Sequence, residues 1–173
     1  MRLFVSVPLT KPVTKSLEKA CDSFRREGVT GRFVPAENFH VTLAFIGEWP
    51  DPEKVLKALE NVTFKPFTIS VSGTGTFGSL LYARVTSGGR LEKLASAVRK
   101  ALKDAGIPMD PKPFRAHVTL IRDAQFSARS EQSVNLSCPE QTVDRFSLMI
   151  SRFDPDRHTM RYQPYASLFA ERN

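Results

Sequence analysis

Two of the three histidines in this chain stand in the same short sequence. The tetrapeptide HVTL occupies His40–Leu43 and occurs again at His117–Leu120. Imidazole titrates close to neutral pH, so two of them can act as one proton donor and one proton acceptor. The threonine hydroxyls Thr42 and Thr119 can donate hydrogen bonds to the oxygens of a small anion such as phosphate. The repeated motif therefore predicts one joint site built from two imidazoles and two hydroxyls.

Both copies of the motif lie in segments typical of β-strands, at 40–46 and 116–121, which are rich in β-branched and apolar residues. Successive side chains of a strand point to opposite faces. Histidine and threonine of each motif thus share one face, and valine and leucine share the other. Two such strands facing each other would surround one anion with the four polar groups.

Two other kinds of histidine chemistry fit the sequence less well. A metal site would need a third or fourth ligand, and apart from His117 itself no His, Cys, Asp or Glu occurs at 41–47 or 113–122. Nucleophilic catalysis would require a serine or cysteine beside the histidine. We therefore expect acid–base chemistry without a metal ion or other cofactor. Arg115 and Arg122 flank the second motif and can add charge-assisted contacts to a bound phosphate.

The elements around the motifs are predicted from the spacing of apolar residues and from Gly and Pro positions. Further strands are expected at 3–7, 32–34, 67–72, 81–86, 142–152 and 159–170, and helices at 12–26, 52–61 and 90–105. Glycines 73, 75 and 78 predict a bend. A motif strand follows a helix in each half, which indicates an internal duplication. We expect an α+β fold, a single bilobal domain over 1–173 with a pseudo-twofold axis. Its two antiparallel or mixed sheets would line a central groove, with the helices outside.

Composition limits the class of protein. The chain has 173 residues, 41% hydrophobic and 25% charged, as is usual for one globular domain. No apolar run approaches the roughly 20 residues that span a bilayer. Residues 1–8 are too short for a signal peptide and are typical of a strand. Cys21 and Cys138 provide no disulfide framework. We expect a cytoplasmic monomer that does not bind membranes.

The net charge is +7 and the isoelectric point is near 9.7. Both halves of the chain share this basic character. Such a charge suits a polyanionic partner such as RNA. A basic, solvated surface without a partner would have the same composition, so charge leaves both interpretations open.

The paired H-x-T-x motifs and their flanks resemble the 2H phosphoesterase superfamily. The matching segments are VPAENFHVTLAFIG at 34–47 and PFRAHVTLIR at 113–122. The resemblance covers nearly the whole chain and is closest to the RNA 2′,3′-cyclic phosphodiesterases, also described as 2′-5′ RNA ligases. Two positions depart from the pattern: Ala116 stands where a proline is common, and Ile121 where a small residue is common. Neither departure removes a catalytic group.

This resemblance implies metal-free opening of the 2′,3′-cyclic phosphate end of an RNA, such as a tRNA fragment, or of a nucleotide, to a 2′-phosphomonoester. It assigns His40 as the acid that protonates the leaving 3′ oxygen and His117 as the base for the attacking water. Thr42 and Thr119 would bind the phosphate, and Arg122 would stabilise its developing charge. With a 5′-hydroxyl in place of water, the reverse reaction would form a 2′-5′ linkage.

Alternatives remain at this stage. In the first alternative, the enzyme acts on a small cyclic nucleotide or a 2′-5′ oligonucleotide. In the second, the protein binds RNA ends or nucleotides without turnover. Phosphate binding alone would not require two proton-transfer groups, which argues against the second. Phe33, Phe45 and Phe77 are expected to pack in the core rather than stack on a base. His158 is expected to be an exposed turn residue.

Overall fold

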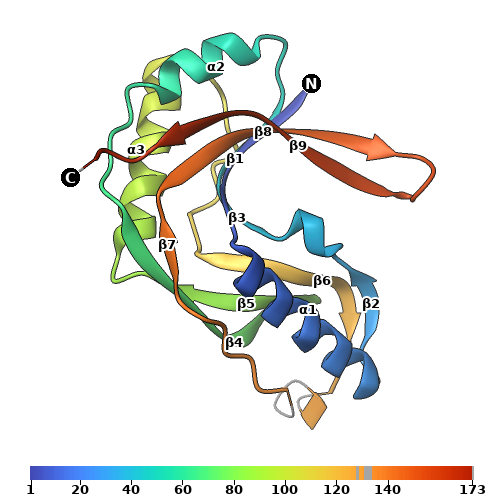
Figure 1. The fold of residues 1–173 in the computed structure, drawn as a ribbon. Coiled ribbons are helices and arrows are strands. Elements are labelled where there is room, and N and C mark those ends of the chain that lie inside the picture. The colour runs from blue at the N-terminus through green and yellow to red at the C-terminus, as the bar shows by residue number, and fades with distance from the viewer. Residues whose placement is uncertain (128, 131–133, 173) are drawn as a thin grey trace.

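The computed structural model describes residues 1–127, 129–130 and 134–172 and contains two β-sheets (Figure 1). The first sheet has four strands in the order β3 (His40–Glu48), β1 (Arg2–Pro8), β8 (Arg145–Asp154) and β9 (Thr159–Phe169). The second has five in the order β2 (Thr30–Phe33), β6 (His117–Gln125), β5 (Leu80–Thr86), β4 (Phe67–Phe77) and β7 (Gln141–Val143). Neighbouring strands in both sheets are antiparallel. Each sheet contains one motif strand, as predicted.

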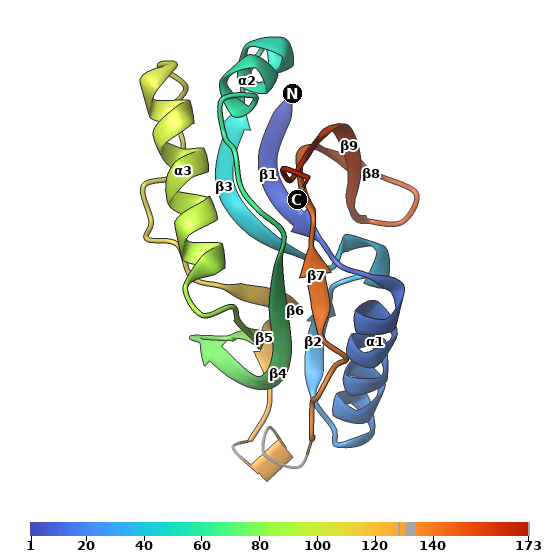
Figure 2. The same ribbon diagram turned by 60° about the vertical axis from the view of Figure 1, so that its left-hand side comes forward.

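Three α-helices cover the outer sides of the sheets: α1 (Lys11–Arg26), α2 (Pro52–Leu59) and α3 (Arg90–Asp104). Figure 2 shows α1 on one side of the sheets and α2 with α3 on the other. The helix α1 buries Val13, Leu17 and Phe24, whose spacing places them on one face. Among the described residues, no helix is long and apolar enough to cross a membrane.

The apolar halves of the two motifs anchor the motif strands in one core. Val41, Leu43, Val118 and Leu120 are all 0% exposed and belong to a single buried cluster that the two sheets share. The motif histidines and threonines are only half-buried. The alternation predicted from the sequence is therefore confirmed in both strands.

Both motifs contain a β-bulge at their leucine. Ser6 and Val5 of β1 face Thr42 and Ala44, which leaves Leu43 without a partner. In the same way, Tyr82 and Leu81 of β5 face Thr119 and Ile121, which leaves Leu120 of β6 without a partner. A bulge inserts one residue and reverses the alternation beyond it.

The bulge in β6 decides where Arg122 points. Arg122 stands five positions after His117, so on a regular strand the two side chains would point to opposite faces. The extra residue at Leu120 turns Arg122 onto the face that carries His117 and Thr119. The same side of the sheet thus gains a cation next to the motif.

Two predicted strands differ from the structure. The predicted strand at 142–152 is divided, because the chain passes from β7 in the second sheet to β8 in the first at Asp144. Glycine 73 does not end its strand. Its positive φ of +75° instead accommodates a register shift between Val71 and Thr74, and β4 continues to Phe77.

Gly31 lets β2 lie close against β6. Its φ is +145°, and a Cβ at this position would lie 2.9 Å from the carbonyl oxygen of Arg122 and 2.9 Å from Cγ2 of Ile121. Only glycine avoids both the unfavourable dihedral angle and the contact with the neighbouring backbone.

We predict that Gly31→Ala lowers the free energy of unfolding by roughly 2–3 kcal/mol, because it combines backbone strain with overpacking. Gly28→Ala is the matched control, since Gly28 also has a positive φ but nothing lies within 4 Å of the position that an alanine methyl would take. The control should cost only about 1 kcal/mol. Urea denaturation of both variants measures the difference, and equal losses would contradict the close approach of the strands.

Candidate active site

A cavity of about 600 Å³ lies between the two sheets. Its lining includes all four polar side chains of the motifs, His40, Thr42, His117 and Thr119. The first pair comes from β3 and the second from β6, so segments far apart in the sequence meet in one groove. The structure brings together the residues that the sequence predicted to share a site.

The ring of His40 is held by hydrogen bonds at both nitrogens. Its Nδ1 lies 2.6 Å from the backbone carbonyl oxygen of Asn38, and its Nε2 lies 2.8 Å from Oγ1 of Thr42. A carbonyl oxygen only accepts, so Nδ1 carries a proton and donates it. In the neutral ring Nε2 is then the acceptor, and the Thr42 hydroxyl donates to it.

The ring of His117 is held by the equivalent backbone contact at Nδ1. Its Nδ1 donates to the backbone carbonyl oxygen of Arg115 at 2.7 Å, again two residues before the histidine. Both imidazoles therefore share one tautomer. In each ring, Nε2 is the nitrogen that the backbone contact does not occupy, and in His40 it accepts from the Thr42 hydroxyl.

Two aromatic rings flank each histidine. Phe4 and Tyr162 lie 5.1 Å and 5.4 Å from the His40 ring, measured between centroids. Phe77 and Tyr82 lie 5.4 Å and 5.6 Å from the His117 ring. These contacts shield the imidazoles from water and restrict their rotation.

Burial lowers the pKa of both imidazoles below the ordinary value of 6.5. The hydrogen bond to the Asn38 carbonyl partly opposes this for His40, whose pKa is lowered further by the charges of His117 and Arg122. The pKa of His117 is likewise lowered by burial, and then by the charges of Arg122 and Arg115. Both rings are thus neutral at neutral pH in the free protein, and an anion between them would favour their charged forms.

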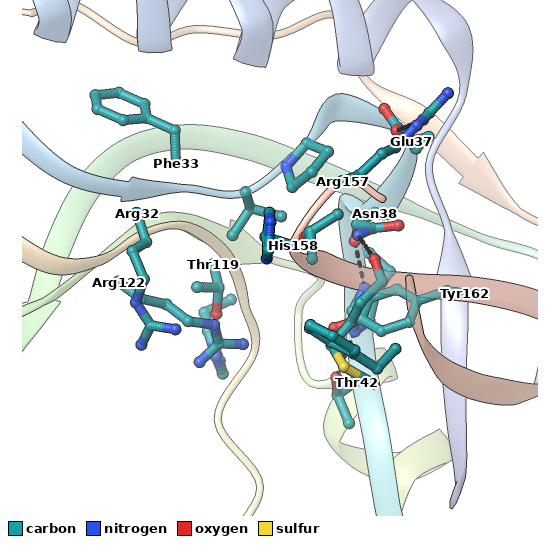
Figure 3. Close-up of a pocket in the computed structure, with 17 residues that line it drawn as sticks. Arg32, Phe33, Glu37, Asn38, Thr42, Thr119, Arg122, Arg157, His158 and Tyr162 are labelled. Carbon is teal, nitrogen blue, oxygen red and sulfur yellow. Dashed lines mark hydrogen bonds and ion pairs between the residues drawn. The ribbon is translucent and has the colours of Figure 1, made fainter. Parts of the chain in front are cut away.

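Of the two arginines predicted to contact substrate, only Arg122 lines the cavity, where it lies beside Thr119 (Figure 3). The Arg115 guanidinium lies over the ring of Phe77, 5.1 Å from its centroid, in a cation–π contact. Arg115 precedes the first residue of β6, so the alternation of a regular strand does not fix its direction. Arg115 contributes its backbone carbonyl to the site, and its charge lowers the pKa of His117.

No group of three or more His, Cys, Asp or Glu side chains suited to a metal ion occurs in the described part of the chain. The cavity lining contains three imidazoles, several hydroxyls, three guanidinium groups and one carboxylate, that of Glu37. This donor set matches an anion rather than a cation.

The family model of the LigT like Phosphoesterase matches residues 7–87. The RNA 2′,3′-cyclic phosphodiesterase of Archaeoglobus fulgidus is 37% identical over 137 residues, which cover 70% of this chain and 72% of that protein. The chain belongs to the LigT-like 2H phosphoesterase family. The Escherichia coli RNA 2′,3′-cyclic phosphodiesterase is 33% identical over 146 residues, covering 78% of this chain and 77% of the relative.

Two solved structures match the fold over almost the whole chain. Apo LigT of Escherichia coli superimposes with a TM-score of 0.82 at 25% identity, covering 99% of this chain and 98% of the other. The protein TT0787 of Thermus thermophilus gives a TM-score of 0.79 at 28% identity, with 98% and 97% covered. The predicted 2H phosphoesterase fold, with two sheets and a groove between them, is confirmed.

Several groove residues of this LigT-like phosphoesterase were not predicted from its sequence. Asn38 is buried, and its Nδ2 donates to the carbonyl oxygen of Met160 at 2.8 Å. That contact joins the turn before β3 to β9. It spans 122 residues, so no local pattern could have indicated it. Arg157 in the β8–β9 turn pairs with Glu37 at 3.5 Å, which ties the same two segments together.

The third histidine and the three phenylalanines considered in the sequence analysis differ in their positions relative to the cavity. His158 is an exposed turn residue, as predicted, with φ of +51°, and it also lies at the cavity rim. Phe33 lines the cavity, with Arg25 placed 4.0 Å over its ring centroid. Phe77 packs against His117 rather than deep in the core. Phe45 is absent from the lining of this cavity.

We predict that both motif histidines of the free protein titrate below pH 6.5 and that inorganic phosphate raises both midpoints, because a bound anion stabilises the charged rings. Nitrogen NMR of the imidazoles measures the midpoints and should show the Nδ1–H tautomer at pH 7. Chloride at equal ionic strength is the control. Midpoints at or above 6.5 in the free protein, or no response to phosphate, would contradict the described electrostatics.

Proposed function

We propose that the groove hydrolyses the 2′,3′-cyclic phosphodiester ends of RNA to 2′-phosphomonoesters by two-histidine acid–base catalysis. The observation that carries this proposal is the pair of Nδ1 contacts to backbone carbonyl oxygens, which leave Nε2 of His40 and of His117 unbound to the backbone in one cavity. Thr42 and Thr119 line the same cavity. The names of the relatives, RNA 2′,3′-cyclic phosphodiesterase, support the substrate class.

In the forward reaction, Nε2 of His117 takes a proton from water as the water oxygen attacks phosphorus. The bond from phosphorus to the 3′ oxygen breaks, and Nε2 of His40 gives that oxygen its proton. A 2′-phosphomonoester and a free 3′-hydroxyl result. Since burial lowers the pKa of His40, the bound phosphate has to raise this pKa for His40 to carry its proton. Proton exchange with solvent restores both rings.

The phosphate is held by neutral donors and one cation. Once His40 carries its proton, Nε2 no longer accepts from the Thr42 hydroxyl, so Thr42 and Thr119 can both donate hydrogen bonds to the non-bridging oxygens. Arg122 stabilises the charge that develops on these oxygens. In the reverse direction, an RNA 5′-hydroxyl takes the place of water and a 2′-5′ linkage forms.

The same groups would open a small cyclic nucleotide or cleave a 2′-5′ oligonucleotide, since a cavity of about 600 Å³ also suits a small ligand. The names of the relatives favour RNA over these small ligands. We further propose that the protein acts as a monomer in the cytoplasm, on RNA fragments such as those of tRNA.

We predict that His40→Ala and His117→Ala each lower kcat by roughly 10²- to 10⁴-fold, because each variant loses one proton-transfer group. Thr42→Val and Thr119→Val should lower it less, by roughly 10- to 10³-fold, because one hydrogen bond to the developing charge is lost. Turnover of a short RNA with a 2′,3′-cyclic phosphate end measures the effect, and circular dichroism checks the fold. A folded histidine variant with near wild-type kcat would overturn the assignment.

We predict that EDTA leaves the turnover of this RNA unchanged, because the proposed steps need only the side chains of the groove. The control is the same enzyme dialysed against buffer without chelator. Loss of activity in EDTA that a divalent ion restores would replace the acid–base mechanism with a metal site on the two histidines.

A further inference from the structure

A second arginine lies beside Arg122 in the groove. Arg32 of β2 is the direct cross-strand partner of Arg122 in β6. Directly opposed residues of an antiparallel pair carry their side chains on one face, with Cβ atoms about 4.5–5.5 Å apart. Both arginines line the cavity, and Figure 3 shows them extending alongside each other next to Thr119.

This juxtaposition depends on irregular backbone. The register shifts between Thr30 and Arg32, where Gly31 of β2 lies opposite two residues of β6, Asp123 and Ala124. Within the shifted segment, Gly31 has φ of +145° and Asp123 has φ of +51°, an uncommon value for a residue other than glycine. Like charges directly opposite each other also destabilise a sheet. Glycine adopts its φ without strain, but the uncommon φ of Asp123 and the repulsion between the two arginines persist together at the cavity, which is characteristic of a binding site.

Arg32 is only partly occupied by its own ion pair. Its Nε and one terminal nitrogen each lie 2.7 Å from Oδ2 of Asp123. The side chains are 72% and 66% exposed, and pairs this exposed stabilise a protein little. Arg32 can bind a phosphate with its remaining N–H groups, and it can also release Asp123 and bind the phosphate in its place.

We propose that Arg32 forms a second phosphate site, which binds the phosphodiester immediately upstream of the cyclic end. This inference rests on the proposed function, in which Arg122 serves the phosphate that reacts. An RNA strand carries a phosphate at every nucleotide, so the guanidinium next to Arg122 is placed for the next phosphate along the strand. The preferred substrate class is then an RNA of two or more nucleotides, rather than a mononucleoside cyclic phosphate.

Three substrates distinguish the effect of the charge on the upstream phosphate from the effect of the upstream nucleotide itself. They are a mononucleoside 2′,3′-cyclic phosphate, a dinucleotide with a normal linkage and a 2′,3′-cyclic end, and the same dinucleotide with an uncharged methylphosphonate linkage. Wild-type kcat/KM should be roughly 10- to 100-fold higher for the charged dinucleotide than for its neutral analogue, because a charge-assisted hydrogen bond is lost in the analogue.

Two variants move this preference in opposite directions. Arg32→Ala should lower kcat/KM roughly 10- to 100-fold for the charged dinucleotide and leave the other two substrates unchanged. Asp123→Asn should raise kcat/KM for the charged dinucleotide up to about fivefold, because Arg32 is released from a weak ion pair while asparagine tolerates the positive φ. Arg152→Ala is the control, since Arg152 also faces an arginine, Arg161, across a strand pair but lines no part of the cavity.

A purely structural role of the Arg32–Asp123 pair predicts the opposite pattern. Both variants would then break the same contact and lower kcat/KM for all three substrates alike, which would overturn the second site. Equal wild-type rates on the two dinucleotides would overturn it as well.

Binding separates this inference from the proposed function. If the wild type turned over none of the three substrates, the proposed function would fail. Calorimetry of the two dinucleotides carrying a 2′-phosphate would still decide the second site: tighter binding of the charged one, lost in Arg32→Ala, supports it, and equal affinities refute it.

Discussion

The site depends on one backbone contact that occurs twice. In each motif strand, the carbonyl oxygen two residues before the histidine accepts the Nδ1 proton, from Asn38 for His40 and from Arg115 for His117. This contact fixes the tautomer and the orientation of the ring, so that Nε2 remains for the groove. Neither carboxylates nor metal ions are needed to orient these rings. A carbonyl carries no net charge, so it orients the imidazole without the strong rise in pKa that a carboxylate partner would cause.

The fold brings the two Nε2 atoms together through a shared core and local irregularities of the strands. The motif valines and leucines are completely buried, which prevents each strand from rotating its histidine away from the groove. The bulges at Leu43 and Leu120 then reverse the alternation at the same point of both strands. In β6 this brings Arg122 to the side of the strand that carries His117 and Thr119. Two copies of one local sequence thus form two halves of one site.

Much of this arrangement follows from local sequence. The two motif strands, the apolar face of each, and helices such as α1 could be predicted because each is encoded by spacing within a few residues. The orientation of Arg122 could not be derived from alternation, since the bulge at Leu120 appears only when β5 and β6 pair. It was anticipated from family resemblance instead. The direction of Arg115 could not be derived from the sequence either, because this residue precedes β6 and its guanidinium lies over Phe77.

Residues that reach the groove from distant segments were also missed. Asn38, Tyr162 and Arg32 enter it through contacts between elements that are far apart in the chain, and their local sequences carry no signal of this. The division of 142–152 between two sheets is a similar case, because the choice of sheet is made by tertiary pairing and not by strand propensity.

The division of labour between the histidines is tested most directly by a substrate whose leaving group needs no proton. kcat/KM of His40→Ala and His117→Ala would be measured on an RNA 2′,3′-cyclic phosphate and on a nitrophenyl phosphodiester. The account predicts that the nitrophenyl substrate partly restores the activity of His40→Ala and not that of His117→Ala. Restoration of His117→Ala alone would exchange the two roles, and equal behaviour of both variants on both substrates would contradict acid–base catalysis by the pair.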